Sequence, residues 1–165
     1  MIISLTSRKA LAALFVLSAG AVVSIAHARD CRYVRGVVEE TQVSGSSCLS
    51  PVALCTVAQM HGPLKGQARF TATSILTTAD TPVTGVVFVT GDTVIADARL
   101  GSMRGSLTIK NAAAFRTVGD GDLSDTQVIT GGTGDFAGAN GSVRVSGTFA
   151  NGSGTATFEG TLCVP

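Results

Sequence analysis

Short runs in which Val, Thr and Ile predominate alternate with turn residues through most of the chain beyond residue 28. These residue types favour the pleated surface of a β-sheet, and residues two apart in such a run share a face. Clusters containing glycine, proline or aspartate, such as Gly62-Pro63 and Gly91-Asp92, separate the runs as turns do. The pattern predicts an all-β chain with these candidate strands: Tyr33–Val43, Cys55–Met60, Gln67–Thr77, Thr84–Thr90, Thr93–Leu100, Leu107–Lys110, Asp125–Thr130, Ser142–Phe149 and Thr155–Cys163.

Glycine also occurs inside or beside the predicted strands, where a strongly coiled sheet uses it to relieve curvature. This placement favours a barrel over a sandwich. One short run beyond residue 28, Asn111–Phe115, suggests a helix, but it is too short to be stable by itself. The glycines concerned are Gly36, Gly85, Gly105, Gly147 and Gly160.

The first 28 residues have the features of an export signal. Arg8 and Lys9 precede an apolar run from Ala10 to Val23, and Ala26-His27-Ala28 fits the small-x-small cleavage pattern. The apolar run is short for a membrane span, which favours a cleaved leader over an uncleaved anchor. We therefore expect a leader at 1–28, one domain at 29–165, and a secreted or periplasmic protein.

Charge excludes some partners. The chain has 12 Lys and Arg against 11 Asp and Glu, and removal of the leader leaves ten basic residues and a net charge of −1. Nucleic-acid binding needs a basic stripe, so we expect no nucleic-acid partner. No second apolar run approaches membrane-spanning length, so we expect no membrane association after processing.

Four cysteines in an exported chain favour disulfides over metal ligands. Their spacing fits no zinc pattern, so we expect no metal. Four cysteines allow three pairings. We favour Cys48–Cys55, which closes a short loop, and Cys31–Cys163, because the first and last strands of an even-stranded antiparallel barrel are neighbours running in opposite directions.

The segment Thr130–Gly141 is too rich in glycine for a helix and lacks the Lys-Ser or Lys-Thr of a phosphate loop. It resembles the Gly-Gly-Thr-Gly-x-Phe-x-x-Ala-x-Gly signature of the allene oxide cyclase and dirigent protein superfamily. The segments Leu54–Thr71, Gly147–Phe149 and Phe158–Cys163 are similar to small secreted bacterial proteins with this barrel domain. We interpret the signature as structural, with Phe136 and Ala139 packed inward beneath a bend. Its positions here are Gly131, Gly132, Gly134, Phe136 and Gly141.

The resemblance implies an eight-stranded antiparallel barrel with an internal cavity, often assembled as a trimer. It also implies an apolar small-molecule partner and no cofactor, since members of the superfamily steer the cyclisation or coupling of a confined guest. Such chemistry needs mainly confinement and orientation. Asp135 stands where relatives often carry Arg or Lys, which puts any role of a basic group at that position in doubt.

Strand alternation groups charged candidates on the polar faces of three predicted strands, and Arg144 lies in a fourth, Ser142–Phe149. If these faces line the interior, Asp97, Arg99 and Glu159 are the catalytic candidates, and Arg69 and Arg144 are the ligand-binding candidates. If the faces point outward, the same residues are ordinary surface charges. The sequence leaves both alternatives open.

Conventional catalytic sets have little support. A Ser-His-Asp triad would depend wholly on His61, which is the one histidine beyond the leader and lies beside Gly62-Pro63 in a predicted loop. Glu39 and Glu40 are adjacent in a strand, so they point to opposite faces and cannot act together as glycosidase carboxylates. The acidic turn containing Asp120, Asp122 and Asp125 lacks the twelfth-position glutamate of a calcium loop.

Two functional hypotheses remain. The first is a cofactor-free cyclase, isomerase or dirigent-like protein that steers an apolar guest. The second is a non-catalytic exported barrel that binds a ligand or a partner. An open cavity with an acid and an arginine pointing in favours the first, and an interior filled by Val, Leu and Phe favours the second.

Overall fold

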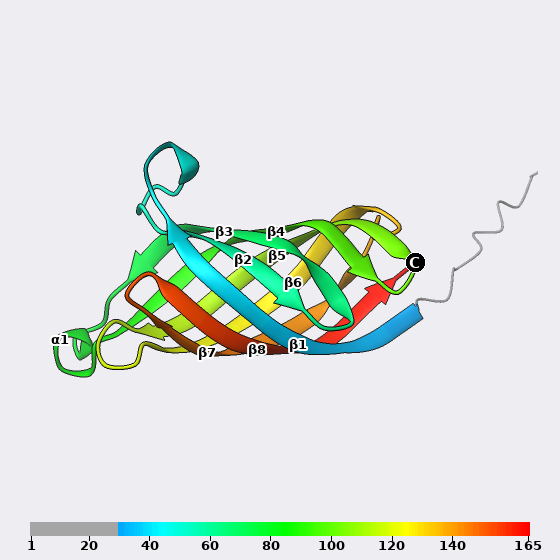
Figure 1. Cartoon of the computed structure of the whole chain (residues 1–165). Helices are drawn as coiled ribbons and strands as arrows, with labels where there is room; N and C mark the ends of the chain where they lie inside the picture. Colours follow the sequence, from blue (N-terminus) through cyan, green and yellow to red (C-terminus); the bar gives the residue numbers. More distant parts are fainter. Residues whose placement is uncertain (1–29) are drawn as a thin grey trace, which may run out of the picture.

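Eight antiparallel strands, each paired with the next along the chain, close into a barrel in the computed structural model, which describes residues 30–165 (Figure 1). Pairing of the last strand with the first closes the ring. This confirms the predicted fold class, whereas the predicted leader lies outside the described residues. The strands are β1 (Asp30–Val43), β2 (Cys55–His61), β3 (Leu64–Leu76), β4 (Val86–Leu100), β5 (Met103–Arg116), β6 (Asp122–Gly134), β7 (Asn140–Ala150) and β8 (Ser153–Val164).

Two local predictions were wrong. The candidate strands Thr84–Thr90 and Thr93–Leu100 belong to one strand, β4, and Gly91 lies in its middle instead of in a turn. A Cβ at Gly91 would overlap the ring of Phe70 on β3, so this glycine makes room for an aromatic side chain. Residues 111–115, the helix candidate, extend β5, because pairing with both neighbouring strands outweighs local preference. The helical segments in the described part are short: α1 (Thr81–Thr84) and η1 (Gly45–Ser47).

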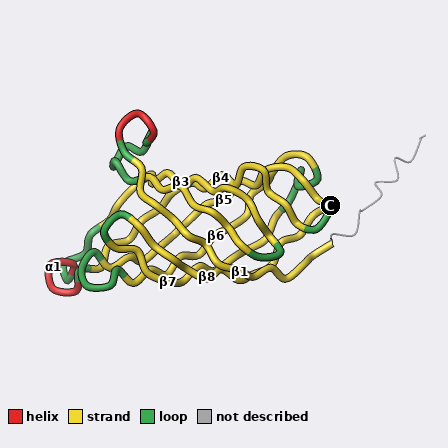
Figure 2. The backbone as a smooth tube through the Cα atoms, viewed as in Figure 1, coloured by secondary structure: helices red, strands yellow, loops and turns green. Residues whose placement is uncertain are grey.

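The two ends of the barrel differ. At one end, which we call the plugged end because buried side chains fill it, residues 62–63, 101–102 and 135–139 form short connections beside the carboxyl terminus (Figure 1). At the loop end, longer segments connect β1 to β2 and β3 to β4, and the loops in Figure 2 project beyond the strands there. In residues 30–165 no helix has the length and hydropathy needed to cross a membrane.

The interior contains two apolar clusters. The larger one fills the plugged end with fully buried side chains, among them Phe136, Leu162 and Val34. The smaller one lies toward the loop end, where Val87 and Val89 pack against partly buried neighbours including Phe115. Burial of a large apolar side chain stabilises the fold by about 1.5–3 kcal/mol, so the plugged end contributes most of the core.

The glycine-rich segment forms the β6–β7 hairpin, as predicted. Phe136 and Ala139 are 0% and 2% exposed, which confirms that they pack inward beneath the bend. Gly134 has a φ of 60°, and a Cβ on Gly132 would lie 2.8 Å from the carbonyl oxygen of Phe136. Both positions therefore need glycine. Gly131 does not, since its Cβ would have only an ordinary contact, 3.4 Å from the hydroxyl oxygen of Thr108.

Asp135 joins this hairpin to the start of β5. Its backbone N–H donates to the carbonyl oxygen of Arg104 over 2.9 Å, and its Oδ2 accepts from the Arg104 N–H over 2.9 Å. An acid at this position therefore has a structural use.

Both favoured disulfides are present. Cys31 pairs with Cys163, and Cys48 pairs with Cys55. Cys31 and Cys163 are opposite one another in the β1–β8 ladder, so this disulfide spans the seam of the barrel. Two disulfides are typical of a protein that folds in an oxidising environment.

Candidate functional site

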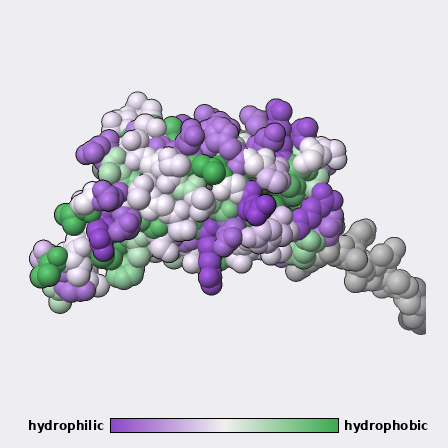
Figure 3. Space-filling view, turned by 60° about the horizontal axis from the view of Figure 1, so that its bottom comes forward, coloured by the Kyte–Doolittle hydropathy of each residue, from purple (hydrophilic) through white to green (hydrophobic). Residues whose placement is uncertain are grey.

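The five charged candidates from the sequence all have exposed side chains. Arg144 and Glu159 are opposite one another in the β7–β8 ladder, and the Tyr33 hydroxyl donates to Glu159 over 2.7 Å on the outer surface. Arg69 donates to the backbone carbonyl of Ser47 over 2.9 Å. On the face shown in Figure 3, hydrophilic side chains form separate groups with apolar residues between them. Within residues 30–165 no salt bridge joins two of these five side chains, so the structure does not bring them together as one charged site.

The strict alternation expected in residues 93–100 was wrong at Asp97. The register of β4 against β5 shifts between Ile95 and Ala98, and Asp97 adopts a φ of 48°. This bulge adds a residue, so Ile95 and Ala98 are both buried, while Asp97 and Arg99 remain exposed. In β3 and β8 the expected alternation is confirmed, with the apolar sets around Ala68 and Phe158 facing inward.

A cavity of about 130 Å³ lies inside the barrel between the two apolar clusters. Its wall is mostly apolar and includes side chains from both clusters, such as Phe158 and Val89. Cavities of this size admit a molecule about as large as benzene. The polar residues in the wall come from five strands and are Glu40, Thr56, Thr93, Asn111, Asp125 and Gln127.

Three of these residues form a hydrogen-bonded group centred on Asp125. Asn111 Nδ2 and Gln127 Nε2 each donate to Asp125 Oδ2 over 2.8 Å. Asn111 and Asp125 are 7% and 8% exposed. Their remaining oxygens, Asn111 Oδ1 and Asp125 Oδ1, are buried and have no hydrogen-bond partner within residues 30–165. Leaving a buried acceptor unpaired costs about 1–3 kcal/mol, so this group has unused capacity to accept hydrogen bonds.

The second carboxylate in the wall is Glu40. Its Oε2 accepts a hydrogen bond from the Thr56 hydroxyl over 3.0 Å. Burial raises the pKa of Glu40 above its ordinary value, the Thr56 hydrogen bond opposes this, and the charge of Asp125 raises the pKa further. The cavity thus holds one carboxyl group that keeps its proton more readily than usual close to a second acid.

Sequence reasoning missed this pair, although a signal was present. Glu40 is in phase with the inward-facing Val34 and Val38 of β1, and Asp125 is in phase with the buried Ile129 of β6. A carboxylate at a position that alternation assigns to the apolar face of a strand is expected to be buried.

The acidic turn does not come together as an ion site. Asp122 forms an exposed ion pair with Arg116 over 3.2 Å, while Asp125 faces the interior. Among residues 30–165 there is no group of three or more His, Cys, Asp or Glu placed to hold a metal ion.

Comparison with known proteins adds no identity. No protein-family model matches this chain, and no curated protein matches it either.

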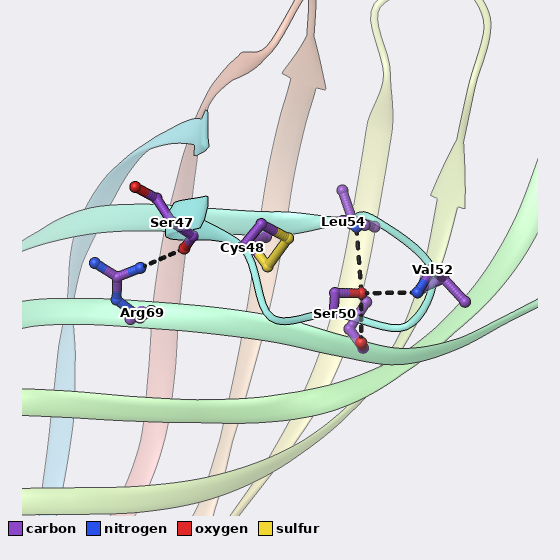
Figure 4. Close-up of a disulfide and its surroundings, with 8 residues drawn as sticks. Ser47, Cys48, Ser50, Val52, Leu54 and Arg69 are labelled. Atoms are coloured by element: carbon purple, nitrogen blue, oxygen red, sulfur yellow. Dashed lines mark hydrogen bonds between the residues drawn. A yellow bond between two sulfur atoms is a disulfide. The ribbon is translucent and has the colours of Figure 1, made fainter. Parts of the chain in front are cut away.

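The loop between β1 and β2 lies against the cavity at the loop end. Ser50 Oγ accepts hydrogen bonds from the N–H groups of Val52 and Leu54 and donates to the carbonyl oxygen of Ala72 on β3 over 2.7 Å (Figure 4). Leu54 is part of the cavity wall, and the Cys48–Cys55 disulfide ties this loop to the start of β2. The loop thereby places an apolar side chain at the edge of the cavity.

Proposed function

We propose that this chain is a small-molecule-binding barrel whose guest occupies the cavity beside Glu40 and Asp125. The observation that carries the proposal is the pair of buried, unpartnered oxygens in an otherwise mostly apolar wall. Burial of polar groups without partners is unfavourable, and a guest that supplies hydrogen-bond donors would recover that loss. Binding sites commonly combine an apolar wall with a few convergent polar groups.

Membership of the allene oxide cyclase and dirigent protein superfamily is part of this proposal. Its support is the glycine-rich signature, whose Phe136 and Ala139 are buried, together with closure of eight antiparallel strands. Export to the periplasm or the medium also belongs to the proposal, supported by the leader pattern and two disulfides. Trimer assembly is a prediction from the resemblance that sedimentation or light scattering would test.

A second candidate function is proton transfer on the bound guest. It is favoured by the raised pKa of Glu40 close to a second carboxylate. Two carboxyl groups on one cavity wall, one of which holds its proton to higher pH than usual, supply the group types that general acid and general base catalysis use. The arginine expected for a steering enzyme is absent from the cavity wall in the described residues. Proton transfer would therefore rest on the two acids.

The binding proposal is tested by titrating the oxidised protein with toluene and benzyl alcohol while recording amide NMR spectra. Shifts are expected at the cavity residues Ala113 and Leu123. Ala113→Leu fills the cavity and should abolish binding. Ala112→Leu is the matched control, because Ala112 is the exposed neighbour on the same strand. Absence of saturable shifts with every probe would overturn the binding proposal.

Proton transfer is tested separately with a small cyclic ketone in heavy water. Deuterium incorporation next to the carbonyl should exceed the buffer rate, and Asp125→Asn should abolish the excess. Glu39→Gln removes an exposed acid adjacent to Glu40 and should retain it. A ketone that binds without deuterium incorporation above the buffer rate would overturn the proton-transfer proposal and leave only the binding function.

A further inference from the structure

The cavity wall has an excess of negative charge and of hydrogen-bond acceptors. Glu40 and Asp125 are the titratable side chains in this wall, and no Lys, Arg or His of residues 30–165 contributes to it. The acidic members of the wall are therefore not neutralised by a basic neighbour inside the cavity. An anionic guest would meet two carboxyl groups in this wall and no cationic partner among residues 30–165.

The hydrogen bonds already formed show which type of group the site lacks. The Thr56 hydroxyl is used as a donor to Glu40. Asn111 Nδ2 and Gln127 Nε2 are used as donors to Asp125 Oδ2. The buried side-chain atoms left without partners in residues 30–165 are Asn111 Oδ1 and Asp125 Oδ1, and both accept hydrogen bonds only. The missing component is a hydrogen-bond donor.

Aromatic rings supply a further part of the wall. Phe70, Phe115, Phe149 and Phe158 all line the cavity. The rings of Phe115 and Phe149 pack edge to face with their centroids 6.0 Å apart. The faces of aromatic rings attract organic cations, and the attraction grows when water is excluded.

We infer that the guest is a small primary ammonium ion with an apolar body of about one ring, held by Asp125, Asn111 and Glu40. The inference rests on the proposed binding function and specifies its ligand class. An ammonium group carries three N–H donors and one positive charge, so it matches both the acceptor excess and the charge of the wall. The cavity of about 130 Å³ accommodates a body the size of a phenyl ring.

Ionisation of Glu40 gives the complex a pH dependence. Burial and the nearby charge of Asp125 hold the pKa of Glu40 above its ordinary value, and a bound cation would favour release of its proton. Affinity for an ammonium ion should therefore rise with pH through the titration of Glu40 and then level off while the amine stays protonated. In Glu40→Gln this rise should be lost.

The test is calorimetric titration of the oxidised protein with benzylamine, benzyl alcohol and benzoate, three probes of nearly equal size. Benzylamine should bind at least tenfold more tightly than benzyl alcohol, and benzoate should not bind. Asp125→Asn keeps an oxygen for Asn111 and Gln127 but replaces the unpartnered oxygen with an NH₂ group. It should weaken benzylamine binding at least tenfold and change benzyl alcohol binding much less. If this variant does not fold, Glu40→Gln provides the same comparison, with Glu39→Gln as its exposed control.

The outcomes separate the two proposals. Equal or tighter binding of benzyl alcohol or benzoate would overturn the ammonium inference and leave the binding function in place. Failure of all three probes, together with toluene, would overturn both. Tight benzylamine binding that Asp125→Asn does not weaken would place the amine elsewhere and also overturn the inference.

Discussion

Cys31 and Cys163 occupy paired positions on β1 and β8, so a single disulfide joins the first and last strands of the barrel. Their sequence separation is 132 residues, whereas Cys48 and Cys55 are separated by 7. A crosslink restricts the unfolded chain more strongly when the loop it closes is longer. The two disulfides should therefore differ in their contribution to stability.

Removal of the seam disulfide should be the more damaging change. In the chain-entropy model, Cys31→Ser with Cys163→Ser loses about 5 kcal/mol of unfolding free energy, and Cys48→Ser with Cys55→Ser loses about 2.5 kcal/mol. Paired substitutions avoid a free thiol. The midpoint of urea unfolding measures both effects. Small and equal shifts would contradict a stabilising role for the seam disulfide.

Glu40 should make stability depend on pH. Because burial and then Asp125 raise its pKa in the folded protein above the ordinary value of 4.5, the folded state holds this proton to higher pH than the unfolded chain does. The free energy of unfolding should fall as pH rises from about 4.5 through the folded-state pKa. Glu40→Gln should remove that loss and be more stable than wild type at neutral pH, with the advantage disappearing in acid.

Glu39→Gln is the control for this experiment, since Glu39 is the exposed neighbour of Glu40. Urea unfolding between pH 4 and 8 would compare the three proteins. The buried-acid assignment fails if the Glu39→Gln and Glu40→Gln profiles coincide.

Adjacent glycines of the signature should differ in their tolerance of alanine. A Cβ at Gly132 would overlap the backbone carbonyl oxygen of Ser106 and lie 2.9 Å from the Cβ of Phe136, so Gly132→Ala should destabilise the protein by about 1–3 kcal/mol. Gly131 has room for a Cβ. Gly131→Ala should therefore leave stability unchanged or raise it by up to about 1 kcal/mol, because alanine lowers the conformational entropy of the unfolded chain. Thermal unfolding of both variants checks the contrast, and equal losses would rule out this explanation.

The exposed charges should not matter for binding in the cavity. Asp97→Asn, Arg99→Gln and Glu159→Gln alter exposed side chains on the outer wall, where water and salt screen their charges. We expect affinities for benzyl alcohol and benzylamine within about twofold of wild type at physiological ionic strength, where isolated surface charges contribute little. A tenfold loss in any of these variants would move the site to the outer wall.

Local residue preferences were enough to predict most of the strands and turns of this protein. β-Branched runs with period-two alternation identified most strands, and glycines within them favoured a barrel. Burial of Phe136 and Ala139 beneath the hairpin and the pairing of the four cysteines also followed from local motifs and strand order. Each of these inferences needs information only from a short segment or from the order of the strands.

The tertiary structure decided the site. The local sequence predicts a turn at Gly91, but in the structure the ring of Phe70 packs against this glycine within a strand. Alternation places Asp97 on the same face as Ile95, but a bulge shifts the register and leaves Asp97 exposed. Glu40 and Asp125 are far apart in sequence, and closure of the ring brings them to one cavity, where Asp125 contributes to the raised pKa of Glu40. Strand alternation gives two faces but not which face is enclosed, because enclosure is a property of the closed sheet.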